Sequence, residues 1–343
     1  MADPDKVTIY EVARRAGVSI ATVSHVFNRP ERVKSSTRER VLDVVDELGF
    51  VPKQTAVSLA RKGVGRIGVL APFTSYSSYA TRLNGILEAC AGRAVEVVVF
   101  DAPSATTAES PLLQTLPTTG RLDGLVIMGL PLDEGTAARL KRGKLTTVLV
   151  DSMHPEFDCV TVDDEAGGYA AGAHLLQRGY RRLVFITESL DIGSAISLNS
   201  ATYASAGELR ARGVVRAMKD AGLDPGDLEW ALTASSIQGG RDAAAQLLDR
   251  PDPPTGFICH LDNIAAGVLA ELRAAGRAVP GEAAVVGYDD SDLAEALDLT
   301  SVHQPFAETG RIAISLLFAA MDGTVGSTQQ VSLKPHLATG GTT

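Results

Sequence analysis

Long apolar runs and paired cysteines are both missing from this sequence of 343 residues. A membrane-spanning helix needs about 18 consecutive apolar residues, and the polar residues 1–6 are unlike a secretory signal peptide. We therefore expect a cytoplasmic protein with no membrane segment. The three cysteines, Cys90, Cys159 and Cys259, form no CxxC pair, so we interpret them as buried apolar residues rather than a zinc site or a disulfide framework.

The short motifs that mark common enzyme classes are also missing. After residue 66 there is no P-loop, no GxGxxG following a strand, no HExxH and no GxSxG. Three histidines, His174, His260 and His303, are scattered along this region, and we interpret them as structural. The sequence therefore predicts neither an enzyme nor a bound cofactor or metal.

Cationic residues are scarce overall but concentrated at one end. The chain carries a net charge of −9, whereas residues 1–63 contain eleven Lys or Arg against eight Asp or Glu. A basic segment on an acidic chain is expected where only that segment meets a polyanion. The length and a hydrophobic content of 45% predict two or three globular units.

Residues 8–50 predict three short helices. The first carries apolar residues at helical spacing: Ile9, Val12, Ala13 and Ala16. Thr8 and Glu11 have the spacing of a capping box, Gly17 permits a tight turn, and Ser19 is placed to cap a second helix at 20–27. Ser36 is placed to cap a third helix that ends at Leu48. Two short helices joined by a glycine turn predict a helix-turn-helix.

The second helix has an apolar side and a small or polar side. Val23 and Val26 point to the core in this pattern. The remaining side chains face outward and are small or able to form hydrogen bonds: Ile20, Ala21, Thr22, Ser24, His25 and Asn28. A three-helix bundle without a DNA-binding role has the same geometry, so the pattern alone leaves both interpretations open.

The amino-acid sequence of this segment resembles that of the headpiece of the lactose and purine repressor family. The resemblance rests on TIYEVARRAGVS at 8–19, ATVSHVFN at 21–28, Thr37-Arg38, and LGFVP at 48–52. It implies that Ile20, Ala21 and His25 contact base edges in the major groove of a pseudo-palindromic operator. It also implies phosphate contacts from four residues: Thr22, Ser24, Asn28 and Thr37.

A short segment at 51–65 follows the headpiece. Its helix-capable part is too short to be stable alone in water. In the family, the matching hinge helix orders on operator DNA and inserts a leucine into the minor groove, a position that Leu59 occupies here, with Ala60 beside it. Val57 stands where the family has an arginine, and a plain flexible linker is the alternative.

From residue 66 onward, β-branched runs alternate with helical stretches, which predicts two doubly wound parallel-sheet lobes with a ligand cleft between them. The resemblance extends here, so the expected fold is a helix-turn-helix headpiece at 1–50 and a periplasmic-binding-protein-like α/β core at 66–343. It places lobe 1 at about 66–162 and 302–322 and lobe 2 at about 163–301 and 323–340.

The resemblance also implies an effector site and a dimer. Arg210 matches an arginine that grips the effector, and Asp289 matches an acceptor for ligand hydroxyl or amine protons. Further rim residues are expected at Ser77, Ser78, Tyr79 and Asp151. Leu261 stands where many members have a polar amide, which makes a less polar or non-sugar effector an alternative.

Together these features predict a homodimeric, effector-controlled DNA-binding regulator, most simply a repressor. A solute-binding protein shares the core fold, but the basic headpiece argues against it.

Overall fold

The computed structural model describes residues 7–28, 30–50, 65–102, 111–116, 121–188, 205–324 and 326–343. The chain forms two compact units, unit 1 with Met1–Thr161 and Phe306–Val331, and unit 2 with Val162–Pro305 and Ser332–Thr343. The chain passes from one unit to the other three times, after Thr161, Pro305 and Val331. The passages predicted from the sequence were at about 162, 301 and 322.

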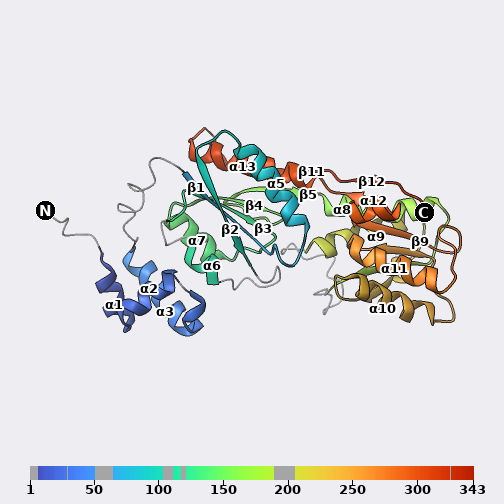
Figure 1. Ribbon diagram of the computed structural model, residues 1–343, viewed down its shortest axis with the longest axis horizontal. Coiled ribbons are helices and arrows are strands. Elements are labelled where there is room, and N and C mark those ends of the chain that lie inside the picture. Colours follow the sequence, from blue (N-terminus) through green and yellow to red (C-terminus); the bar gives the residue numbers. More distant parts are fainter. Residues whose placement is uncertain are drawn as a thin grey trace. The chain divides into compact units, whose positions relative to one another are not determined.

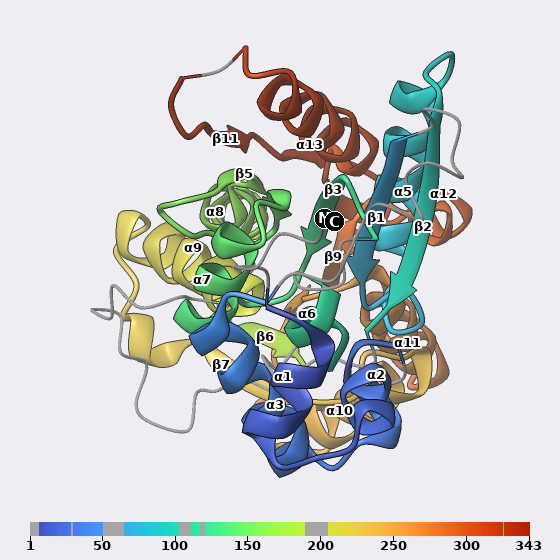
Figure 2. The same ribbon diagram turned by 90° about the vertical axis from the view of Figure 1, so that its left-hand side faces the viewer.

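The headpiece consists of short helices, drawn in blue in Figure 2. Their apolar side chains form one buried cluster. Its elements are α1 (Ile9–Ala16), α2 (Ile20–Asn28), η1 (Pro30–Arg32) and α3 (Ser35–Leu48). Glu11 Oε2 accepts from the Thr8 amide at 2.8 Å, which confirms the expected cap of α1. The expected cap of α3 is wrong, because this helix begins one residue earlier, at Ser35, with Lys34 in the cap position.

Unit 1 contains a six-stranded sheet with helices on both faces (Figure 1). Its strands are β1 (Gly65–Ala71), β2 (Val95–Asp101), β3 (Gly124–Met128), β4 (Thr146–Val150), β5 (Asp158–Val162) and β11 (Gln330–Leu333), in the order β11-β5-β4-β3-β1-β2. The helices α5 (Ser78–Cys90) and α13 (Phe306–Met321) cover one face, and α6 (Pro111–Thr115) and α7 (Glu134–Arg142) cover the other. β1 to β5 pair in parallel.

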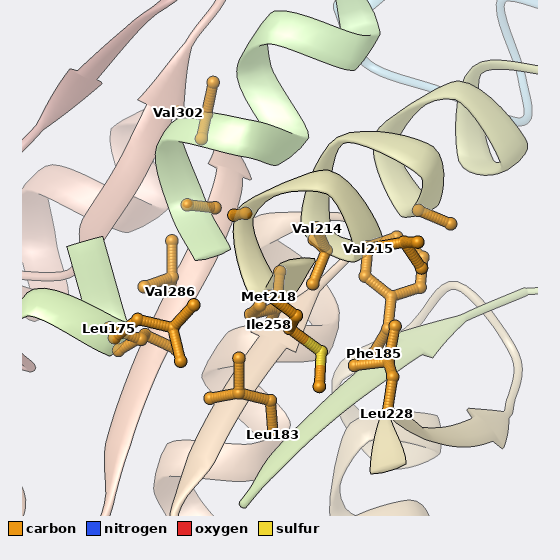
Figure 3. Packing of buried hydrophobic residues seen from close by; sticks show 14 of the residues in the cluster. Leu175, Leu183, Phe185, Val214, Val215, Met218, Leu228, Ile258, Val286 and Val302 are labelled. Carbon is orange, nitrogen blue, oxygen red and sulfur yellow. The ribbon is translucent and has the colours of Figure 1, made fainter. Parts of the chain in front are cut away.

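Unit 2 repeats this arrangement. Its strands are β6 (Leu183–Thr187), β7 (Glu229–Leu232), β8 (Gly256–Cys259), β9 (Ala284–Asp289), β10 (Thr300–His303) and β12 (His336–Ala338), in the order β12-β10-β9-β8-β6-β7. Its helices are α8 (Asp164–Gln177), α9 (Ala206–Asp220), α10 (Ile237–Leu248), α11 (Asp262–Ala274) and α12 (Asp292–Leu297), with the 3-10 turn η4 (Pro225–Asp227). Figure 3 shows side chains of α9, such as Val214 and Met218, packed near Leu183 and Phe185 of β6.

The two sheets confirm the predicted fold class of two doubly wound lobes with an N-terminal helix-turn-helix. Each central strand is almost fully buried, as in β3, β6 and β8, because helices cover both faces of a parallel sheet. The three cysteines are buried and free, as expected. Among the described residues, no helix is long and apolar enough to cross a membrane.

Candidate functional site

The outward side of α2 carries the predicted base-contacting residues. Val23 and Val26 are fully buried, whereas Ala21 and His25 are exposed and Ile20 is 41% exposed. The helix contains no acidic residue in its first turn, which keeps its positive N-terminal end free of a carboxylate. This side of α2 can therefore approach a polyanion and present three short side chains to it.

Hydroxyl groups flank that surface. Ser19 Oγ accepts from the Thr22 amide at 3.0 Å and lies 2.8 Å from Thr22 Oγ1, so Ser19 is the cap of α2 that the sequence predicted. Thr22, Ser24 and Thr37 are all partly buried. Three predicted contacts, the side chain of Asn28 together with Leu59 and Ala60, lie outside the described residues.

A second polar group lies in unit 2 around Arg210 of α9, which is 5% exposed. The Arg210 Nε donates to Asp164 Oδ1 at 2.7 Å, and its Nη1 donates to the His260 carbonyl at 2.8 Å. The guanidinium carbon lies 3.7 Å from the centre of the Tyr288 ring. We call Arg210, Asp164, His260, Tyr288 and Asp289 the Arg210 cluster.

Burial sets the protonation of this cluster. Burial by itself lowers the pKa of Arg210, but Asp164, Tyr288 and Asp289 more than offset it, so the pKa lies above its ordinary value and the cation is kept. Burial and the Arg210 charge hold the pKa of His260 well below its ordinary value, so this imidazole is neutral. Burial likewise raises the pKa of Tyr288, which stays a phenol.

Asp289 ends β9 in a backbone conformation that favours glycine, with φ of 108°. Its Oδ1 accepts from Gln304 Nε2 at 2.7 Å. Strained conformations of this kind concentrate at functional sites. Leu261 precedes α11 at the cap position and forms no capping hydrogen bond, so it adds an apolar side chain where a polar one would cap the helix.

Asp262, the residue after Leu261, is buried within unit 2. Asp262 is 2% exposed, and it accepts from Ser291 Oγ at 2.8 Å and from Ser301 Oγ at 2.7 Å. Burial raises its pKa in spite of these hydrogen bonds. Its carboxylate is therefore engaged by unit 2 itself.

In unit 1, the expected rim residues lie at the carboxyl ends of the strands. Ser77 precedes α5 and is exposed, Ser78 is half-buried, and Tyr79 is buried. Asp151 follows β4 with φ of 54° and forms an ion pair with Arg82 of α5. Arg82 is 3% exposed.

The effector-binding residues predicted from the sequence do not include several polar residues that contact or lie beside them. The missed residues are Arg82, Asp164, Tyr288 and Gln304. A signal for Arg82 was present, because its Arg-x-x-Gly spacing to Gly85 repeats that of Arg210 to Gly213. The ring of His260, interpreted as structural, lies 3.5 Å from Arg210 Nη1.

The other two scattered histidines also have partners within unit 2. His174 Nε2 lies 2.7 Å from Thr343 Oγ1, and His303 Nδ1 lies 2.9 Å from Asp290 Oδ2. These contacts agree with the structural interpretation of both.

Comparisons with known proteins agree with this architecture. Residues 8–53 match the family model described as bacterial regulatory proteins, lacI family, and residues 173–343 match that of a periplasmic binding protein-like domain. The chain is 31% identical to the ribose operon repressor of Escherichia coli, covering 96% of this chain and 98% of that protein. It is 29% identical to catabolite control protein A of Priestia megaterium, covering 96% of this chain and 97% of that protein.

A solved structure extends the likeness to three dimensions. The structure titled as a complex of the transcriptional regulator CelR with cellobiose has a TM-score of 0.70 and 27% sequence identity, and the match covers 98% of this chain and 100% of that one. The headpiece, the two repeated sheets and these full-length relatives lead to one assignment. This chain belongs to the lacI family of bacterial regulatory proteins and is a DNA-binding transcription regulator.

Proposed function

We propose that this regulator is a homodimeric repressor whose affinity for a pseudo-palindromic operator is controlled by a small, uncharged, hydroxyl-bearing effector bound by the core. The Arg210 cluster carries the proposal. It holds a buried cation already paired with a carboxylate, beside a second carboxylate, Asp289, that accepts hydrogen bonds. In this account the protein works in the cytoplasm and catalyses no reaction.

The headpiece reads the operator through α2. Ile20 and Ala21 offer apolar contact to thymine methyl groups, and His25 can donate to a purine acceptor. Thr22, Ser24, Asn28 and Thr37 hold phosphates, while Leu59 with Ala60 enters the minor groove. The support is the exposure of Ile20, Ala21 and His25 on one helix whose other side is fully buried. Two headpieces would then contact half-sites about one helical turn apart.

Charge favours a neutral effector. The Arg210 cluster holds two carboxylates, Asp164 and Asp289, and one cation, Arg210. His260 adds no positive charge at neutral pH, because its imidazole is uncharged. An anionic ligand would therefore meet repulsion, whereas hydroxyl groups could donate to Asp289 and Asp151. Relatives named for ribose and solved with cellobiose agree with a sugar-like ligand.

The other predicted effector-binding residues offer side chains of different kinds, in unit 1 and in unit 2. Ser77 and Ser78 add hydroxyl groups, and Tyr79 adds an aromatic ring. Leu261 contributes an apolar side chain in place of a polar amide, which favours a ligand with one less polar face. A less polar, non-sugar metabolite is the second candidate effector on that observation.

Exposed apolar side chains support a dimer through the core. In unit 1, Leu87 of α5 is 45% exposed and Val99 of the edge strand β2 is 47% exposed. In unit 2, Leu232 of the edge strand β7 is 62% exposed and Ile237 at the start of α10 is 47% exposed. Equivalent edges of both sheets thus carry apolar residues that a second copy would cover.

Footprinting of the full chain on its own upstream DNA tests the DNA-binding part, together with sedimentation of the free protein. We expect a protected pseudo-palindrome and a dimer. Protection that is equal on unrelated DNA, or a monomer that still protects both half-sites, would overturn this part of the proposal.

A further inference from the structure

Two helices of unit 1 meet through side chains of opposite charge. One is α3 of the headpiece and the other is α7 on the sheet, and both belong to this unit. α3 contributes Asp43 and Asp46, and α7 contributes Arg139 and Arg142. Residues three apart lie on one face of a helix. The contact therefore joins an acidic face of α3 to a basic face of α7.

Asp46 is the centre of this contact. Its Oδ2 lies 3.1 Å from Arg139 Nε and 2.8 Å from Arg142 Nη2. Asp43 Oδ1 lies further away, 3.9 Å from Arg139 Nη2. The side chains of Asp46 and Arg139 are 22% and 16% exposed, so water screens this pair less than it screens a fully exposed surface bridge. Asp46 and Arg139 therefore contribute most to the contact.

The ends of the two helices favour the same pairing. Asp46 lies in the last turn of α3, which contains no basic residue. The carboxyl end of a helix carries partial negative charge, so a carboxylate there is unfavourable unless a cation lies close to it. Arg139 and Arg142 lie in the last turn of α7, where a cation is favourable. The arginines of α7 thus supply the cations that the end of α3 lacks.

The contact leaves the proposed DNA-binding side of α2 open. Ile20, Ala21 and His25 are exposed while α3 contacts α7. A second pair of elements, η1 of the headpiece and α6, is also in contact. Contacts at two places restrict rotation of the headpiece more than one contact does. The headpiece is therefore oriented by α6 and α7 without losing the surface that would meet DNA.

We propose that Arg139 and Arg142 form a docking site for the acidic face of α3 of the same chain, which holds the headpiece on α7 in the DNA-free regulator and keeps it ready to bind DNA. Because both partners belong to one chain, their effective concentration is high, and a few weak bridges are enough to keep them together. Readiness for DNA rests on the proposed reading of the operator through α2, whereas the docking itself does not.

Chemical cross-linking of the full chain tests the docking. Asp43→Cys together with Arg142→Cys places two thiols at the edge of the contact and keeps the bridge between Asp46 and Arg139. The three native cysteines are buried, so a short bis-maleimide should react with the introduced pair. Without DNA and at low salt, we expect rapid cross-linking within one chain, identified by mass spectrometry of the digested protein. High salt should slow it, because salt screens exposed charges.

Charge reversal separates docking from folding. In the two-cysteine protein, Asp46→Lys places a like charge opposite Arg139 and should slow cross-linking by about fivefold or more. Adding Arg139→Asp restores a pair of opposite charges and should recover most of the rate, which a headpiece that had merely unfolded would not do. Glu47→Gln is the matched control. Glu47 is the next residue of α3 but pairs with Arg15 inside the headpiece, so its loss should leave the rate unchanged.

Operator binding of the cross-linked protein tests whether the docked headpiece is ready for DNA. We expect the cross-linked protein to bind its own upstream DNA as tightly as the untreated two-cysteine protein, because docking leaves the proposed DNA-binding side of α2 exposed. A cross-linked protein that has lost this binding, while the untreated protein keeps it, would show that docking inhibits the regulator and would overturn this part of the proposal.

Three results of the cross-linking would overturn the docking itself. Cross-links could join two chains, the rate could be the same with Asp46→Lys, or Arg139→Asp could fail to recover it. The docking is measured without DNA. If neither the cross-linked nor the untreated protein bound the operator, the proposed reading of DNA would be contradicted and the docking would stand, so the two failures are distinguishable.

Discussion

Asp164 and Arg210 form an ion pair across the crossing of α8 and α9, with Asp164 Oδ1 2.7 Å from Arg210 Nε. The side chains are 13% and 6% exposed, so the pair is largely removed from water. Because Arg210 is buried, Asp164 serves the stability of unit 2 as well as the charge of the Arg210 cluster.

Asp164→Asn should destabilise unit 2 by about 3–5 kcal/mol, because it leaves a buried cation without its carboxylate. Urea unfolding measures the change in the free energy of unfolding. Glu208→Gln is the matched control, since Glu208 pairs with Arg212 in a more exposed i, i+4 bridge. That change should cost less than about 1 kcal/mol. Equal losses in both variants would show that the Asp164 pair is not a buried one.

Gly168→Ala should lower the free energy of unfolding by about 1–3 kcal/mol, because the added methyl group forces α8 and α9 apart. Its Cβ would lie 1.9 Å from the Arg210 carbonyl oxygen. The shift should also weaken effector binding, since Arg210 moves with α9. Gly326→Ala, where a Cβ meets nothing within 4 Å among the described residues, should leave both properties unchanged. Thermal unfolding and ligand titration check the pair of variants.

His25→Ala should reduce affinity for the operator by about 1–3 kcal/mol and leave binding to scrambled DNA nearly unchanged, because a base contact carries sequence information. Thr37→Ala should weaken binding to the operator and to scrambled DNA alike, as expected for a phosphate contact. Fluorescence anisotropy at one fixed salt concentration measures the affinity of each variant for each of the two DNAs. Gln238→Ala on α10 of unit 2 is the control. An equal loss on both DNAs for His25→Ala would contradict its assigned role.

Stability should fall as the pH drops below about 6.5, because His260 resists protonation in the folded protein. Its folded pKa is well below its ordinary value, so only the unfolded chain takes up a proton in this range. The contribution of His260 is complete above the unfolded pKa and declines toward lower pH by up to about 1.4 kcal/mol per pH unit.

His260→Gln tests this by flattening the pH dependence of the free energy of unfolding between pH 7 and 5. A His260→Gln protein with the wild-type slope would show that His260 is protonated in the folded state.

The sequence predicted those features that follow from local pattern. Val23 and Val26 are buried because of helical spacing, and the central strands are recognisable as β-branched runs between helices. Asp289 and Asp151 were named because the resemblance to the repressor family carried its effector-site positions onto them, not because of a local pattern. The cap of α3 was misplaced by one residue, since Ser35 and Ser36 look alike as caps in sequence.

The missed residues depend on contacts between distant segments. Arg82 gives no local sign of burial, because arginine in a helix usually lies on the surface, and its partner Asp151 is far away in the chain. Asp164 looks like an ordinary acidic residue in the first turn of a helix. The third passage, predicted at about 322, lies after Val331, within the short strand β11 that joins a sheet built from earlier strands.

The central claim is that a ligand of the core changes operator affinity. The most direct test measures the equilibrium affinity of the full chain for its own upstream DNA at fixed salt, with and without the tightest-binding neutral sugar. We predict a change of about 5- to 150-fold, equivalent to about 1–3 kcal/mol of coupling. Weaker binding would identify an inducer and tighter binding a corepressor. An unchanged operator affinity at saturating ligand would contradict the account.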